Sequence, residues 1–239
     1  MPIVACYGDS IVTGRRGASS PDRRWAARVC AELGSSERTH AVDGLGFVRS
    51  RGPGRTHTGE PLGVLADVLA SDADACVVAL GVNDSVIVAE RHDEVAAAIT
   101  RDLDLLVQRF GTGRLAVLDL YAPWADTRPP GWRTVRGLLD AAARTHGRTL
   151  LPGLADAVRA DPALLCADGV HPNDAGHAAL ATAVLPRLRD VLAPPTSCGR
   201  GQVAPGPTTP PELIAAPASG SAAGRTARTA GDPGTPSSG

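Results

Sequence analysis

This sequence holds a serine, a histidine and an aspartate at positions where they could together perform acyl chemistry. Ser10 stands in Gly8-Asp9-Ser10, straight after the apolar start of the chain. A serine hydroxyl is a poor nucleophile until a base takes its proton, and an imidazole suits that task near neutral pH. His171 is the candidate base. Asp168, three residues earlier, can accept from the other ring nitrogen and hold the tautomer.

Acyl chemistry also needs donors that stabilise the negative oxygen of a tetrahedral intermediate. Ser10 can offer its own backbone N–H, and Gly44 lets a second backbone N–H approach a substrate because it has no Cβ. Asn83 can offer its side-chain amide. The segment 43–47 holds two glycines. We choose Gly44, which falls nearer the end of a predicted strand, with Gly46 as the alternative.

Each of these groups also has an ordinary structural interpretation. Gly, Asp and Ser are common turn formers, Asn83 can make an Asx turn at a strand end, and His171 can begin a helix without a partner. The four segments that carry Ser10, Gly44, Asn83 and the Asp168/His171 pair, however, are all predicted to meet at one edge of a sheet. This coincidence favours catalysis by Ser10, with Asp9 as a structural neighbour. A non-catalytic module that binds ligands at the same edge is the alternative.

Apolar runs that alternate with helical patterns position these groups. Strands are predicted over residues 2–7, 39–42, 73–80 and 115–120, with a short last strand at 149–151. Helices are predicted over residues 21–33, 62–69, 93–110, 135–146 and 174–192, the last with an Asn/Asp cap. The first three strands end at the turns that carry Ser10, Gly44 and Asn83.

Strands that alternate with helices predict a parallel sheet with helices on both faces. We expect an α/β fold of three α/β/α layers, with five parallel strands in a flavodoxin-like order. Ligands of such open sheets bind outside the carboxyl ends of the strands. Residues 1–193 are expected to form this domain. Pro, Gly, Ser, Thr and Ala dominate residues 194–239, which are expected to be a disordered tail.

The four polar segments resemble, in order, the four sequence blocks of the SGNH hydrolases, also called GDSL esterases/lipases. The blocks are Gly8-Asp9-Ser10, Gly44, Gly81-Val82-Asn83-Asp84 and Asp168-Gly169-Val170-His171-Pro172-Asn173. The resemblance implies a flavodoxin-like α/β/α fold and metal-free hydrolysis of carboxylic esters through an acyl-enzyme. It assigns Ser10 as nucleophile, His171 as base and Asp168 as the residue that orients it. It also implies an oxyanion hole of the Ser10 and Gly44 N–H groups and Asn83 Nδ2. Ile11 replaces the family's usual Leu, a volume-conserving change.

Composition argues against several other classes of protein. The net charge is −1, so a broad nucleic-acid surface, which would carry a basic excess, is not expected. No stretch approaches about 18 uninterrupted apolar residues, which argues against a transmembrane segment. The N-terminus enters a strand without a signal-peptide pattern, so we expect a cytoplasmic protein. Five scattered cysteines fit small buried hydrophobes in a reducing compartment.

Other enzyme classes lack their motifs. No G-x-S-x-G occurs, which argues against a standard α/β-hydrolase. The G-x-G-x-x-A at residues 111–116 links a helix to a strand, the reverse of what pyrophosphate binding needs. A P-loop needs a lysine, and the chain has none. Histidines are dispersed, so no metal and no cofactor are expected, and His177 is interpreted as a packing or surface residue.

The expected substrate is a small-molecule acyl ester. An acyl-enzyme can pass its acyl group to water or to another alcohol, so an acyltransferase or a deacetylase remains an alternative. Residues 49–57 and 121–132 are expected to line the pocket, because loops on a rigid scaffold carry specificity. Arg49, Arg51 and Arg55 could hold an anionic substrate or belong to a solvated loop.

Overall fold

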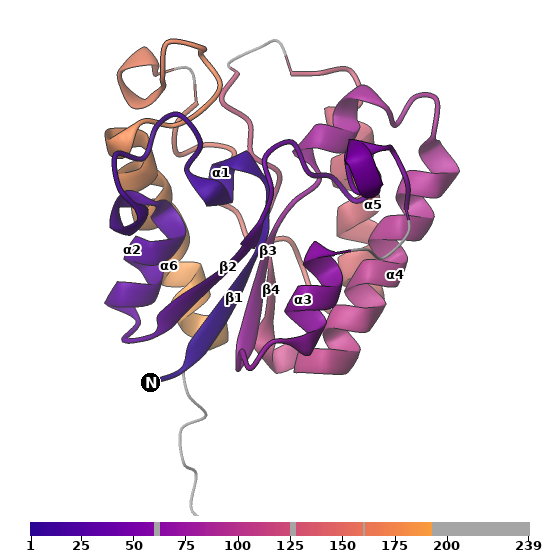
Figure 1. Ribbon diagram of the computed structural model, residues 1–239, viewed down its shortest axis with the longest axis horizontal. Helices are drawn as coiled ribbons and strands as arrows, with labels where there is room; N and C mark the ends of the chain where they lie inside the picture. Colours follow the sequence, from indigo (N-terminus) through magenta and orange to yellow (C-terminus); the bar gives the residue numbers. More distant parts are fainter. Residues whose placement is uncertain (60–62, 125–127, 160, 193–239) are drawn as a thin grey trace, which may run out of the picture. The chain divides into compact units, whose positions relative to one another are not determined.

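A parallel sheet built from the strongest apolar runs forms the centre of the fold. The computed structural model describes residues 1–59, 63–124, 128–159 and 161–192. β1 (Ile3–Gly8) lies between β2 (Ser36–Ala41) and β3 (Ala75–Ala79), and β4 (Leu115–Val117) pairs with β3. All three pairings are parallel, and the strand order is β2-β1-β3-β4 (Figure 1). The predicted α/β fold with a parallel sheet is confirmed.

The sequence predicts five strands, whereas the described residues form a sheet of four. In the segment 149–151, which was expected to be the fifth, Leu151 makes a single parallel bridge with Leu118. Pro152 follows and has no N–H with which to extend a ladder. Gly153 then turns the chain with a φ of 135°. Pairing at this edge of the sheet therefore stops after one residue.

Helices cover both faces of the sheet (Figure 1). α2 (Trp25–Glu32) and α6 (Asp174–Leu192) pack together on one face. α3 (Val64–Ala70), α4 (His92–Phe110) and α5 (Trp132–Thr145) cover the other face. α1 (Ser10–Thr13) is a single turn beyond the end of β1. Short 3₁₀ turns lie at residues 21–23, 53–55, 82–86, 112–114 and 162–164.

Alternating side chains of β1 supply both layers of the core. Ala5 and Tyr7 belong to the apolar cluster on the side of α4, whereas Val4 and Cys6 belong to the cluster under α2 and α6. Successive side chains of a strand point to opposite faces, so a strand covered on both sides is apolar throughout. This explains why the apolar run near the N-terminus shows no polar alternation.

The remaining structural expectations concern cysteines, His177 and the tail. Cys6, Cys30 and Cys76 are buried and unpaired, as predicted. His177 is a packing residue, because it is fully buried on α6 and its Nδ1 accepts from the Trp25 N–H at 3.3 Å. Residues 194–239, predicted to be a disordered tail, lie outside the described residues.

Two kinds of feature are absent from the described residues. None of their helices is both long and apolar enough to cross a membrane. Nor do three or more His, Cys, Asp or Glu side chains in these residues gather closely enough to hold a metal ion.

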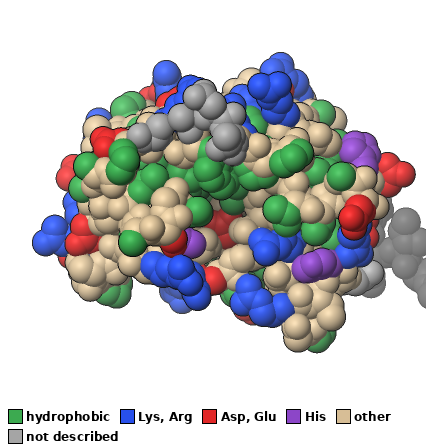
Figure 2. Space-filling view, turned by 90° about the horizontal axis from the view of Figure 1, so that it is seen from above, with side chains coloured by type: hydrophobic (Ala, Val, Ile, Leu, Met, Phe, Trp, Pro, Cys, Tyr) green, Lys and Arg blue, Asp and Glu red, His purple; other side chains and the backbone are tan. Residues whose placement is uncertain are grey.

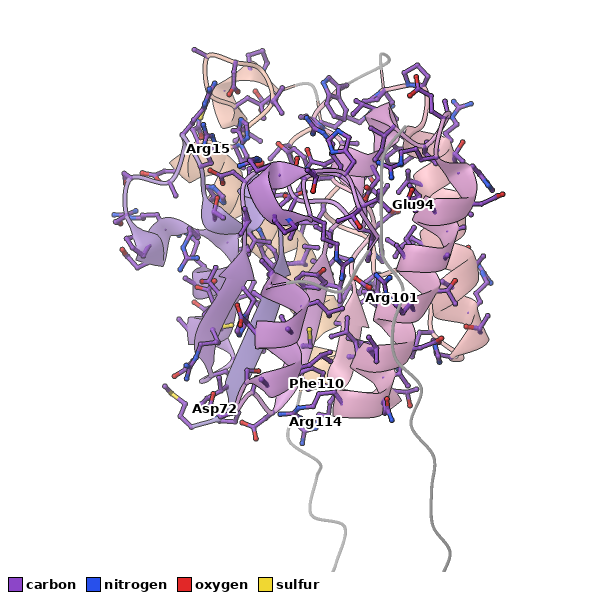
Figure 3. The ribbon with its side chains drawn as sticks, turned by 45° about the vertical axis from the view of Figure 1, so that its right-hand side comes forward. Arg15, Asp72, Glu94, Arg101, Phe110 and Arg114 are labelled. Atoms are coloured by element: carbon purple, nitrogen blue, oxygen red, sulfur yellow. The ribbon has the colours of Figure 1, made fainter. Side chains whose placement is uncertain are left out.

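A buried ion pair ties the segment after β2 to α4. Nη1 of Arg51 lies 2.6 Å from Oδ2 of Asp102, and both side chains are almost fully buried. The same Nη1 donates to the Phe47 carbonyl at 2.8 Å, and the Tyr7 hydroxyl donates to Asp102 at 3.3 Å. Arg101, labelled on α4 in Figure 3, pairs with the other carboxylate oxygen at 2.8 Å. Arg51 therefore serves the structure and does not face a substrate.

We predict that Arg51→Met lowers the free energy of unfolding by about 3 kcal/mol, because it leaves the Asp102 carboxylate buried without its closest cation. The double variant Arg51→Met/Asp102→Leu should recover a large part of this loss. Urea denaturation measures both. Arg38→Met, which breaks an exposed pair with Asp72, is the control and should change stability by less than about 1 kcal/mol. Wild-type stability in Arg51→Met would contradict the prediction.

Candidate active site

The turn after β1 presents Ser10 at the carboxyl edge of the sheet. Asp9 is the N-cap of α1, and its Oδ1 accepts from the Ile11 N–H at 3.0 Å. Gly14 ends the turn in the left-handed conformation, with a φ of 74°. Gly8 is required by packing, since a Cβ there would lie 2.7 Å from a carbonyl oxygen of β3. Glycine and aspartate thus shape the tight turn that exposes the serine.

Ser10, His171 and Asp168 form a hydrogen-bonded chain. Nε2 of His171 lies 3.0 Å from Oγ of Ser10, and Nδ1 lies 2.8 Å from Oδ2 of Asp168. With Nδ1–H donating to the carboxylate, Nε2 is free to accept the proton of the serine hydroxyl. The structure therefore brings together the three residues that the sequence singled out.

The loop before α6 holds His171 in place. Asn173 caps α6 as expected, because its Oδ1 accepts from the Gly176 N–H at 3.0 Å. Its Nδ2 donates to the carbonyls of Ala163 at 2.8 Å and Leu165 at 3.2 Å. The carbonyl of His171 accepts from a backbone N–H of the same loop at 2.8 Å. The imidazole is therefore carried by a loop that is anchored on both sides of it.

Asp168 is held in its charged form. Its Oδ1 accepts from the backbone N–H groups of His171 and Val170, each at 3.0 Å. These bonds, that of His171 first, hold the pKa of Asp168 well below its usual range. Arg16 also lies near, with Nη1 3.3 Å from Oδ2. A carboxylate that stays charged can orient the imidazole and stabilise the imidazolium.

Two backbone N–H groups beside Ser10 are available to a ligand. Gly44 has a φ of 74°. The carboxylate of the preceding Asp43 accepts from Thr13 Oγ1 of α1 at 2.6 Å and pairs with Arg15, which follows α1. The N–H groups of Ser10 and Gly44 have no hydrogen-bond partner among the described residues. Ser10 and Gly44, which line the same pocket, therefore each have a backbone N–H that is free among the described residues.

Gly46, the alternative to Gly44, has a packing role. Its N–H donates to the Arg49 carbonyl at 2.8 Å, and a Cβ at this position would lie 2.4 Å from Oδ1 of Asp84. Gly44 lines the pocket over Ser10, and Gly46 does not. These contacts favour Gly44 as the glycine that faces a substrate.

Asn83 follows β3 and lies beside the serine turn, but its amide is engaged. Nδ2 donates to Asp9 Oδ2 at 3.0 Å and to the Leu45 carbonyl at 2.9 Å. Oδ1 accepts from Nη1 of Arg49 at 2.8 Å. Both hydrogens of Nδ2 are thus used within the protein. Asn83 must exchange one of these bonds before it can donate to a substrate oxygen.

Asp84 has a role that sequence reasoning missed. Its buried carboxylate accepts from the backbone N–H groups of Phe47 at 2.7 Å, Val48 at 3.1 Å and Arg49 at 2.9 Å. Burial raises the pKa of Asp84, and the three backbone bonds oppose that rise. The carboxylate folds the segment after β2 over the sheet edge. Its place in the Gly81–Asp84 motif was the available signal.

Asp9 is a second buried carboxylate at the site. Only 1% of its surface is exposed, and burial raises the pKa of Asp9 to about 7. Its oxygens accept from the N–H of Ile11 and from Nδ2 of Asn83. From the sequence alone, Asp9 is interpreted as a structural neighbour of Ser10. The structure places a group that titrates near neutral pH in contact with the Asn83 amide.

An open pocket of about 500 Å³ lies over Ser10 and His171. Its described lining consists of Ser10, Arg15, Arg16, Asp43, Gly44, Arg55, Asp168, Val170 and His171. Figure 2 looks onto this end of the molecule, where arginine, acidic and histidine side chains gather beside a band of apolar ones. Figure 3 shows Arg15 at this end and Asp72 at the opposite end.

The two loops expected to line this pocket differ in what they contribute. Residues 49–57 supply Arg55. The described residues of 121–132 do not line the pocket, and 125–127 lie outside the described part of the chain. Tyr121 supports the loop that carries His171, since its hydroxyl donates to the carbonyl of the preceding Val170 at 2.7 Å.

A parallel sheet between two layers of helices, with Ser, His and Asp hydrogen-bonded at its carboxyl edge, is an architecture suited to ester hydrolysis. Residues 6–179 match the model of the GDSL-like lipase/acylhydrolase family. A GDSL lipase of Mycobacterium tuberculosis is 34% identical over 190 residues, which cover 77% of this chain and 80% of that protein. The chain belongs to the GDSL-like lipase/acylhydrolase family and is an esterase or lipase of that type. The predicted family and enzyme class are confirmed.

Solved structures share the fold at low sequence identity. Est24, a carbohydrate acetylesterase from Sinorhizobium meliloti, superposes with a TM-score of 0.59 at 18% identity, covering 79% of this chain and 98% of that one. The psychrotrophic esterase EstA from a Pseudoalteromonas species gives a TM-score of 0.57 at 12% identity, covering 79% and 97%.

We predict that the pH dependence of stability is smaller in Asp9→Asn than in the wild type. Below its folded pKa of about 7 Asp9 is protonated in the folded protein, whereas the unfolded chain already releases this proton near pH 4. Stability from this group is therefore lost as pH rises through about 7. Between about pH 5 and pH 8, the variant should gain about 2 to 3 kcal/mol relative to wild type.

Urea unfolding at both pH values measures this shift. Asp72→Asn, which changes an exposed carboxyl paired with the permanently charged Arg38, is the control and should keep a constant difference from wild type. An equally constant difference for Asp9→Asn would contradict the prediction.

Proposed function

We propose that this protein hydrolyses small carboxylic esters through an acyl-enzyme formed on Ser10. The observation that supports this most is the chain Ser10 Oγ to His171 Nε2 at 3.0 Å and His171 Nδ1 to Asp168 at 2.8 Å. The free N–H groups of Ser10 and Gly44 add the donors that a developing oxyanion needs.

In acylation, Nε2 of His171 takes the proton of the Ser10 hydroxyl while Oγ attacks the carbonyl carbon of the ester. The carbonyl oxygen becomes negative and accepts from the N–H groups of Ser10 and Gly44. Asn83 Nδ2 joins them when one of its present bonds opens. The intermediate collapses as the carbon–oxygen bond to the alcohol breaks, and the imidazolium returns its proton to the leaving alkoxide.

In deacylation, a water molecule takes the place of the alcohol. His171 removes a proton from the water, the resulting oxygen attacks the acyl carbon, and Oγ leaves as the proton returns to it. Asp168 keeps the imidazole in the required tautomer during both halves of the reaction. An alcohol in place of water would give acyl transfer by the same steps.

We predict that Ser10→Ala and His171→Ala each lower kcat for a short aryl ester by at least about 10⁴-fold, since both are needed to form the acyl-enzyme. Asp168→Asn should retain more activity, because nucleophile and base stay in place. Release of the aryl alcohol measures all three variants. Arg38→Gln, whose ion pair with Asp72 is exposed, is the control. Full activity in Ser10→Ala would disprove the mechanism.

The pocket lining favours a short acyl group on a polar alcohol. Val170 supplies the one aliphatic side chain among the described lining residues, whereas Arg15, Arg16, Asp43 and Arg55 are charged. A long acyl chain gains about 0.8 kcal/mol per methylene only where it leaves water for an apolar wall.

We therefore predict that kcat/KM for aryl esters does not rise from acetate to decanoate. A series of esters with one aryl alcohol measures this, and all members share the leaving group as an internal control. A rise of about tenfold or more along the series would contradict the proposed preference.

A further inference from the structure

Two arginines in the segment after β2 bind to amide oxygens at the site. Nη1 of Arg49 donates to Oδ1 of Asn83 at 2.8 Å. Nη2 of Arg55 donates to the carbonyl oxygen of Asp43, which belongs to the peptide group that includes the Gly44 nitrogen. In both cases the nitrogen of the same amide is a donor of the oxyanion hole proposed above.

A cation at an amide oxygen strengthens the amide as a donor. The C–N bond has partial double-bond character because the nitrogen shares its electrons with the oxygen. A guanidinium at the oxygen draws more electron density from the nitrogen toward the oxygen, so the N–H hydrogen becomes more positive. Hydrogen bonds polarise one another along such chains, and charge-assisted bonds are about twice as strong as neutral ones.

We propose that Arg49 and Arg55 are positioning residues that orient and polarise the two amides of the oxyanion hole. The inference rests on the proposed function, because it assumes that Gly44 N–H and Asn83 Nδ2 bind the oxyanion. In a trans peptide the oxygen and the N–H point in opposite directions. Arg55 therefore acts on Gly44 N–H from the side away from the substrate oxygen.

The backbone around Arg55 supports a specific role. Arg55 has a φ of 64° and Ser50, in the same segment, a φ of 56°. For a non-glycine residue this left-handed conformation is strained, because Cβ lies close to the following carbonyl oxygen. Such strain persists where the surroundings impose it and clusters at functional sites. Gly44 also leaves room for the guanidinium, because a Cβ there would lie 2.8 Å from Nη2 of Arg55.

Arg49 determines which way the Asn83 amide faces. A guanidinium only donates, so the amide oxygen must turn toward it. The Leu45 carbonyl only accepts, and the Asp9 carboxylate only accepts in its charged form, so Nδ2 turns toward them. The position of Arg49 is itself held by Asp84, which accepts its backbone N–H at 2.9 Å. If the Asn83 amide were rotated by 180°, its oxygen would face these acceptors and its NH₂ group would face the guanidinium donors.

The test compares Arg49→Gln and Arg55→Gln with wild type on an uncharged aryl ester. We expect kcat to fall about 5- to 30-fold in each variant, less than for loss of a whole oxyanion donor, with KM changed less than about twofold. Arg55→Lys should recover part of the loss because it keeps the charge. The inhibition constant of an alkylboronic acid, which forms a tetrahedral adduct on Ser10, should rise by a similar factor.

The outcomes separate this inference from the function on which it rests. Wild-type kcat in both glutamine variants, with Ser10→Ala inactive, would overturn the inference and leave the function standing. A rise in KM confined to an anionic ester would show that the arginines bind substrate, which also overturns it. Activity in Ser10→Ala would refute the function itself. Arg38→Gln, an equal charge change in an exposed ion pair, should match wild type, and circular dichroism checks folding of every variant.

Discussion

The parallel register of β1 with both of its neighbours is the constraint on which the site depends. Gly8, the last residue of β1, pairs with Ala41 at the end of β2 and with Ala79 at the end of β3. The three strands therefore finish level with one another. The turns that follow begin side by side and carry Ser10, Gly44 and Asn83. A slip of one residue would turn every side chain of a strand to the other face and misplace the turn after it.

Beyond the sheet edge the ladder can no longer satisfy backbone polar groups, and buried carboxylates take over that task. Asp84 accepts three N–H groups of the segment after β2, and Asp102 holds Arg51 of the same segment. Asp9 fixes the first turn of α1 and the Asn83 amide. Burying these groups is costly, and the raised pKa values of Asp9 and Asp84 express that cost. In the folded protein these buried carboxylates hold the loops in fixed positions.

The sequence has arginine but no lysine, and the planar fork of donors of arginine serves several purposes here. Arg51 bridges a carbonyl and a carboxylate inside the protein. Arg49 and Arg55 reach amide oxygens at the site, and Arg16 lies near Asp168. These roles were not separable in the sequence, where Arg49, Arg51 and Arg55 stand in one glycine- and proline-rich stretch. Only their partners, which lie in the turn after β2, in α4 and in the turn after β3, distinguish them.

Residue type and local periodicity by themselves predicted the class of chemistry and most of the elements. The alternation of apolar runs with helical stripes predicted the parallel α/β sheet. The types of Ser10, His171 and Asp168 pointed to one another because acyl chemistry needs all three. Tertiary structure decided what depends on distant partners. It left Gly44 open to the pocket, buried Arg51, and engaged both hydrogens of Asn83. It also ended the predicted fifth strand after one bridge. Periodicity and residue type are local properties of the chain, whereas burial and hydrogen-bond partners are set by contacts between distant segments.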